Sequence, residues 1–179
     1  MALTVETGAG LPDADAFVSV ADADDLAQAR GVTDWIGKSQ ADREAAIRRA
    51  TSWLSALIWH GSRTHGRAQA LAWPRFGVSD ADGNMIQTDE VPTEVRKACS
   101  LLAFEEARQP GALSPDAGDR QTKRERVGSL EVEYMNATAA SLPSGMRWEE
   151  VRLLLSPLVD DQLAGGDGSG LKLSDVARA

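Results

Sequence analysis

The segment 123–134 constrains the fold most, because it predicts a β-hairpin whose register can be read from the sequence. Gly128-Ser129 separates two alternating runs, and a two-residue loop that begins with glycine favours a type II′ turn. Closing the turn there pairs apolar with apolar and basic with acidic residues, namely Val127 with Leu130, Arg126 with Glu131, and Arg124 with Glu133. Such cross-strand pairs stabilise an antiparallel ribbon. This pairing explains the basic cluster at 123–126 without a nucleic acid.

Elsewhere, apolar side chains recur at the spacing of helices. The clearest stretch starts after Ser39, a typical N-cap residue, and is expected to run to about Trp59. Its apolar positions include Ala46, Ala50, Trp53, Leu54 and Leu57, and its polar face includes Glu44, Arg48, Ser52 and Ser55. Further helices are expected over 20–30, over 92–109 and near 148–155, with Ser19 and Pro92 marking two of the starts.

The remaining segments complete the expected architecture. Residues 1–18 resemble an extended lead-in, and 60–91 an irregular segment with a turn at Asp82-Gly83. Gly165, Gly166, Gly168 and Gly170 favour a flexible joint. We therefore predict a mainly α fold, a bundle of about four helices with a β-hairpin extension at 122–135. The expected domain spans 1–163, and a flexible Gly-rich C-terminal arm spans 164–179.

Composition limits the function classes. The chain has 179 residues and a formal net charge of −8, which disfavours broad binding to DNA or to anionic membranes. It has one cysteine, Cys99, so no disulfide can form within the chain, and burial as a small apolar side chain is expected. No apolar run is long enough to span a membrane, and the first ten residues are not typical of a signal peptide. We expect a protein that stays in the cell or in an assembly built there.

Motifs for chemistry are weak. Asp80 to Asn84 resembles the start of a calcium loop, but Met85 and Val91 occupy the places where such a loop needs glycine and glutamate. His60 and His65 lack further ligands at metal-binding spacing. The glycines at 165–170 lack the Gly-Lys-Ser/Thr of a phosphate loop. We therefore expect no enzyme and no catalytic, cofactor-binding or metal-binding residues.

One arrangement leaves room for a nucleic acid. Trp59 and Trp73 lie near Arg63, Arg67 and Arg75 in the sequence, and aromatic side chains beside cations are typical of platforms that bind single strands. The alternative is that these tryptophans pack the loop onto the helices.

Several segments together carry a family resemblance. They occur in the order Ser19–Asp24, Arg49–Leu54, Gln69–Arg75, Val91 to Ala98, and Arg124–Tyr134. Over about residues 1–160, the chain resembles a phage and prophage family often labelled "putative DnaT-like single-stranded DNA-binding protein". In its helix–hairpin–helix organisation it is also similar to the head-to-tail connector (adaptor, head-completion) proteins of long-tailed phages.

The two resemblances imply different functions. A connector would be a structural virion protein at the head–tail interface, assembled in the bacterial cytoplasm. It would form a ring of copies of itself, twelve by resemblance, between the portal protein and a tail-side connector or tail terminator protein. Double-stranded DNA would pass through the lumen without specific binding. The net charge of −8 favours this function, because a negative lumen repels phosphate. The alternative is a single-stranded DNA-binding protein of phage replication.

Residues for partner binding follow from the connector expectation. Arg124, Arg126, Glu131 and Glu133 of the hairpin are expected to meet an adjacent subunit. In the arm, apolar side chains are expected to dock on the portal or on a neighbouring copy; they are Leu171, Leu173 and Val176.

Overall fold

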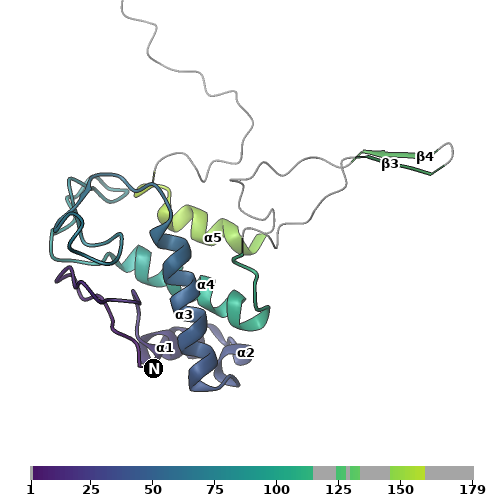
Figure 1. The fold of residues 1–179 in the computed structure, drawn as a ribbon, viewed down its shortest axis with the longest axis horizontal. Coiled ribbons are helices and arrows are strands. Elements are labelled where there is room, and N and C mark those ends of the chain that lie inside the picture. The colour runs from purple at the N-terminus through teal and green to yellow at the C-terminus, as the bar shows by residue number, and fades with distance from the viewer. Residues whose placement is uncertain (1, 115–123, 128–129, 134–145, 160–179) are drawn as a thin grey trace, which may run out of the picture.

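The computed structural model describes residues 2–114, 124–127, 130–133 and 146–159. Within these ranges the chain is mainly helical, as predicted, with two small antiparallel sheets. The helices are α1 (Val20–Arg30), α2 (Thr33–Ile36), α3 (Gln40–Ser55), α4 (Thr93–Arg108) and α5 (Met146–Leu155). The strands are β1 (Ser62–Arg63), β2 (Arg75–Phe76), β3 (Arg124–Val127) and β4 (Leu130–Glu133). Figure 1 shows α1 and α2 at one end of α3 and the long segment before α4 at its other end.

Local signals set the helix starts. The side-chain oxygen of Ser19 accepts a hydrogen bond from the N–H of Asp22 at 3.0 Å, and that of Ser39 accepts one from Asp42 at 3.2 Å. Both predicted N-caps are thereby confirmed. Gly31 ends α1 with a φ of 68°, a left-handed conformation that favours glycine. The prediction that the helix after Ser39 reaches Trp59 is wrong, because α3 ends at Ser55 and the chain tightens into a turn there.

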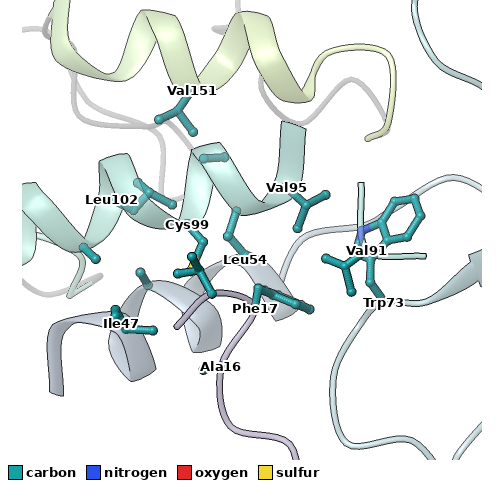
Figure 2. Packing of buried hydrophobic residues seen from close by; sticks show 14 of the residues in the cluster. Ala16, Phe17, Ile47, Leu54, Trp73, Val91, Val95, Cys99, Leu102 and Val151 are labelled. Carbon is teal, nitrogen blue, oxygen red and sulfur yellow. The ribbon is translucent and has the colours of Figure 1, made fainter. Parts of the chain in front are cut away.

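The core lies between α3 and α4. Figure 2 shows Leu54 and Ile47 of α3 facing α4, while Val151 of α5 covers the other side of α4. Ala14, Ala16, Phe17 and Val18 also enter this core, and Phe17 is fully buried. The expected lead-in is therefore partly structural: the N–H of Phe17 donates to the hydroxyl of Thr51 on α3.

Helix α2 is a short element that the sequence analysis did not predict. Its Trp35 is fully buried, and the ring centroids of Trp35 and Phe104 lie 5.0 Å apart. The indole N–H of Trp35 donates to Asp24 at 2.7 Å, and Asp24 also accepts from Arg43 of α3 at 2.6 Å. A single carboxylate thus joins α1, α2 and α3.

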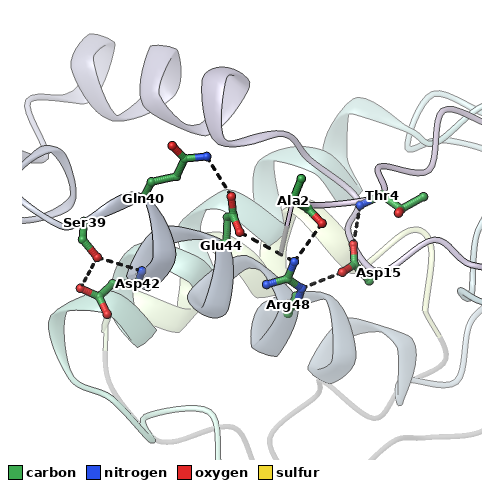
Figure 3. A network of polar contacts seen from close by, with 8 residues as sticks. All are labelled: Ala2, Thr4, Asp15, Ser39, Gln40, Asp42, Glu44 and Arg48. Atoms are coloured by element: carbon green, nitrogen blue, oxygen red, sulfur yellow. Dashed lines mark hydrogen bonds and ion pairs between the residues drawn. The ribbon is translucent and has the colours of Figure 1, made fainter.

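The polar face predicted for α3 is partly covered. Glu44 is only 7% exposed and accepts a hydrogen bond from Gln40. Arg48 donates to the carboxylate of Asp15 at 2.6 Å and to the backbone carbonyl of Ala2 at 3.1 Å (Figure 3). Glu44 therefore lies on the predicted polar face without being exposed, because the N-terminal segment lies along this side of α3 and is held there by polar contacts.

The hairpin has the predicted register. The structure pairs Arg124 with Glu133, Glu125 with Val132, Arg126 with Glu131, and Val127 with Leu130. Its strands span 124–127 and 130–133, inside the expected 122–135. The expected boundary at 163/164 and the arm 164–179 lie outside the described residues.

Candidate functional site

The segment between α3 and α4 is organised by one arginine. Arg75 is 9% exposed and stands opposite Arg63 in the β1–β2 ladder. Its guanidinium donates to four backbone carbonyls, at 2.7 Å to His60, 3.1 Å to Ala72, 3.2 Å to Trp59 and 2.7 Å to Gly61. Burial, and secondarily the nearby charge of Arg63, lowers the pKa of Arg75. Arg75 therefore serves the loop's own backbone and is not displayed to a ligand.

The tryptophans of this segment are also internal. Trp59 is 5% exposed and Trp73 is 0% exposed, and their rings meet edge to face with centroids 5.6 Å apart. The indole N–H of Trp59 donates to the carbonyl of Leu54 at 2.9 Å. The basic-aromatic platform of Trp59, Trp73 and Arg75 is thus ruled out as a surface, and the alternative, packing of the loop onto the helices, is confirmed.

A smaller cationic surface remains. From Ala45 to Ser79 the sequence has no aspartate or glutamate. Arg67 is exposed, Arg63 is half-buried, and Phe76, which pairs with Ser62 in the β1–β2 ladder, is 50% exposed. The loop is held by Gln69, which is 2% exposed, accepts from the N–H of His65 and donates to the carbonyls of Leu71 and Pro74. The sequence signal that could have indicated this surface is the absence of acidic residues from this long stretch.

The next stretch has the opposite charge. From Phe76 to Val95 there is no lysine, arginine or histidine, whereas five carboxylates occur; they are Asp80, Asp82, Asp89, Glu90 and Glu94. The hydroxyl of Thr64 donates to the carbonyl of Thr88 at 2.9 Å and joins the two stretches. Cations and carboxylates therefore lie on neighbouring segments of the loop. Because carboxylates repel an anionic ligand, such a ligand would contact only a limited area.

The candidate calcium loop is a turn. One carboxylate oxygen of Asp80 accepts from the N–H groups of Asp82 and Asn84 at 2.9 and 2.8 Å. The side-chain hydrogen bond from Asn84, with these backbone bonds, lowers the pKa of Asp80. Within the described ranges, no group of three or more His, Cys, Asp or Glu side chains is placed to hold a metal ion.

Two further residues have side chains of reactive types, but their surroundings indicate structural roles. The ring of His65 lies so close to Gly10 that a Cβ there would come 2.1 Å from it. Cys99 is fully buried beside Thr51, and burial raises the pKa of its thiol to about 11. A thiol that stays protonated and has no access to solvent is a poor nucleophile.

The predicted partner-binding residues divide into two groups. Arg124, Arg126, Glu131 and Glu133 are brought together on neighbouring strands by the β3–β4 register. Leu171, Leu173 and Val176 lie outside the described residues. Among the helices described, none has the length and apolar character needed to cross a bilayer.

Comparison with known families shows which family the chain belongs to. A family model described as "Putative DnaT-like ssDNA binding protein" matches residues 1–178. The chain belongs to this family. The match extends through the Gly-rich arm, beyond the residues 1–160 that carry the resemblance in the sequence. Neither a curated protein nor a solved structure matches the chain.

Proposed function

We propose that this protein binds single-stranded DNA. The observation that carries the proposal is the family match over residues 1–178, since the description of that family names this ligand. The connector function that the net charge favoured in the sequence has no such match, and it becomes the second candidate.

The acid-free stretch supplies the contact surface in this proposal. Binding of single strands without sequence preference combines cations for the backbone with aromatic faces for the bases. Arg63 and Arg67 provide the cations, and the half-exposed ring of Phe76 provides the aromatic face. No ion pair occupies either arginine among the described residues. With two phosphate contacts, affinity is modest and falls roughly sevenfold between 50 and 200 mM salt.

The test is fluorescence anisotropy of a labelled oligothymidylate. The double variant Arg63→Gln/Arg67→Gln should lose most of the binding and most of its salt dependence, because both phosphate contacts are gone. The matched control Lys38→Gln/Lys97→Gln removes the same charge from one half-buried and one exposed lysine outside the stretch and should bind like the wild type. A wild-type chain that binds no oligonucleotide would reject the proposal.

The second candidate is the head-to-tail connector, a ring of copies beneath the portal. Two observations favour it: the net charge of −8, and the burial of Trp35, Trp59 and Trp73, which removes them as stacking platforms for bases. A ring of this kind would let double-stranded DNA pass and would join the portal to a tail protein.

Purified virions separate the two candidates. A connector is a constituent of the particle at the head–tail junction, so mass spectrometry of virions and imaging of portal complexes should find it. A replication protein would be absent from particles and bound to single strands in infected cells. Deleting residues 165–179 should also weaken attachment to portal rings if the arm docks there.

A further inference from the structure

The register of the hairpin sorts its charges by strand. Arg124 and Arg126 on β3 are the partners of Glu133 and Glu131 on β4. Because alternate residues of a strand share a face, these four positions belong to one face of the ribbon. One edge of the ribbon therefore carries two arginines and the other carries two glutamates.

The backbone groups of the same four positions have no partner within the β3–β4 ladder. Val127 and Leu130 are partners with two residues between them, so they form the hydrogen-bonded pair that closes a two-residue loop. Hydrogen-bonded and non-hydrogen-bonded pairs alternate along an antiparallel ladder. The N–H and C=O groups of Arg124, Arg126, Glu131 and Glu133 therefore point away from the partner strand, and no third strand described in the structure joins this sheet.

The opposite face of the ribbon is mainly apolar in sequence. By register it holds Val127, Leu130 and Val132, with Glu125 as the polar exception. A two-stranded ribbon is marginally stable alone in water, and free edges beside an apolar face favour addition of another strand.

We propose that copies of this chain associate through these two edges, with β4 of one copy pairing antiparallel with β3 of the next. Glu131 and Glu133 then stand opposite the arginines at 126 and 124 of the neighbouring copy. The symmetric alternatives, β3 against β3 or β4 against β4, would place like charges opposite each other. The contact joins two different edges, so it is heterologous and repeats from copy to copy until the assembly closes or extends.

This association is independent of DNA binding. A chain that binds no oligonucleotide can still pass the test below, and a chain that binds DNA as a monomer fails it. The two proposals therefore stand or fall on separate measurements.

Charge exchange between the strands is the test. Native mass spectrometry and sedimentation should show that the wild type self-associates. Reversing one strand, by Glu131→Arg/Glu133→Arg or by Arg124→Glu/Arg126→Glu, should weaken association at least about tenfold. Exchanging all four charges should restore it. The control Asp25→Arg/Asp34→Arg makes the same change of net charge as Glu131→Arg/Glu133→Arg, on the exposed surface of α1 and α2, and should associate normally.

A mixing experiment distinguishes weaker contact between copies from lower stability of the hairpin within one copy. The fully exchanged chain keeps opposite charges across its own strands, but in the proposed β4-to-β3 contact each of its edges meets a wild-type edge of like charge. An isotope-labelled wild type should therefore form oligomers with itself and not with the exchanged chain. Statistical mixing would overturn the proposal, and so would a wild type that stays monomeric at its highest soluble concentration.

A proline variant covers the case in which the exchanged chain does not fold. Glu131→Pro removes one outward N–H from β4, which an edge strand tolerates. Association should weaken while the helical circular dichroism stays unchanged, and unaltered association would count against pairing through this edge.

Discussion

Arg75 is a buried cation that no carboxylate neutralises among the described residues. Its donors are used by backbone carbonyls on both sides of the loop, so one side chain replaces the hydrogen bonds that a regular sheet would supply. Burial is the main cause of the lowered pKa of Arg75. Burial disfavours the charged form, so holding the guanidinium in this place costs free energy. An arginine is suited to the task because its planar fork has five donors.

Replacing Arg75 should destabilise the fold without any ligand present. Arg75→Gln leaves several buried carbonyls without a donor, and we expect a loss of roughly 2–4 kcal/mol in the free energy of unfolding. Urea denaturation followed by circular dichroism measures it. Arg67→Gln, an exposed arginine in the same loop, should stay within about 0.5 kcal/mol of the wild type. Equal effects of the two changes would contradict the role given to Arg75.

Individual buried carboxylates could not be predicted from the sequence. Glu6 accepts hydrogen bonds from the N–H groups of Gly8, Gly10 and Leu11, and it is 2% exposed. Nothing in its local pattern distinguishes it from a solvated glutamate. Its burial depends on how the N-terminal segment folds back on itself, which is a non-local property.

At the level of elements, a glutamate joins α3 to the segment after α4. The Glu106 side chain is 1% exposed, and Arg49 of α3 lies 2.6 Å from one of its oxygens. The carboxylate also accepts from the N–H groups of Gly111 and Leu113, at 2.7 and 3.0 Å. The segment beyond α4 is thereby fixed against both helices.

Removing this carboxylate should cost far more than removing its neighbour. Glu106→Ala leaves two N–H groups without their acceptor and a buried space, so we expect a loss of roughly 3 kcal/mol in unfolding free energy. Glu105→Ala removes a partly exposed residue that pairs with Arg108, and we expect less than about 1 kcal/mol. Thermal and urea unfolding of the two variants provide the comparison. A reversed order would show that the contacts of Glu106 are not important.

Elements with local signals were the predictable ones. The hairpin register follows from a two-residue turn, and α1, α3 and α4 follow from caps and apolar periodicity. Helix α2 is only four residues long, too short for a periodic pattern. The β1–β2 ladder pairs residues on either side of a long loop, so no local pattern marks it.

At the scale of the whole molecule, the end of α5 closes onto the loop. Leu158 is fully buried, and its carbonyl accepts from the N–H of His60 at 2.9 Å. Val159, 4% exposed, forms an isolated bridge with Trp59. Residues far apart in the sequence therefore complete one core.

Truncation should show this closure. A chain that ends at Ser156 lacks two buried apolar side chains that a chain ending at Val159 keeps. We expect the shorter chain to be less stable by roughly 3–5 kcal/mol. Both chains lack residues 160–179, so the arm does not enter the comparison, and calorimetry measures the difference. Equal unfolding temperatures would contradict this account.

The candidate site was only partly predictable for the same reason. Arg63 and Arg67 were singled out from the sequence, but Trp59, Trp73 and Arg75 were grouped with them by proximity in the chain. Proximity does not say which side chains face inward. The fold divides the group by burial, and only the two arginines remain candidates for a ligand.

The edge-to-face contact of Trp59 and Trp73, together with the bonds of Arg75, fastens the loop at its base. The stretch from Ser62 to Ala68 lies beyond this base and is held by its own bonds, from Thr64 to Thr88 and from His65 to Gln69. Exposed positions within it, such as Arg67, can therefore exchange side chains while the backbone keeps its path. Recognition can be altered at such positions at a small cost in stability.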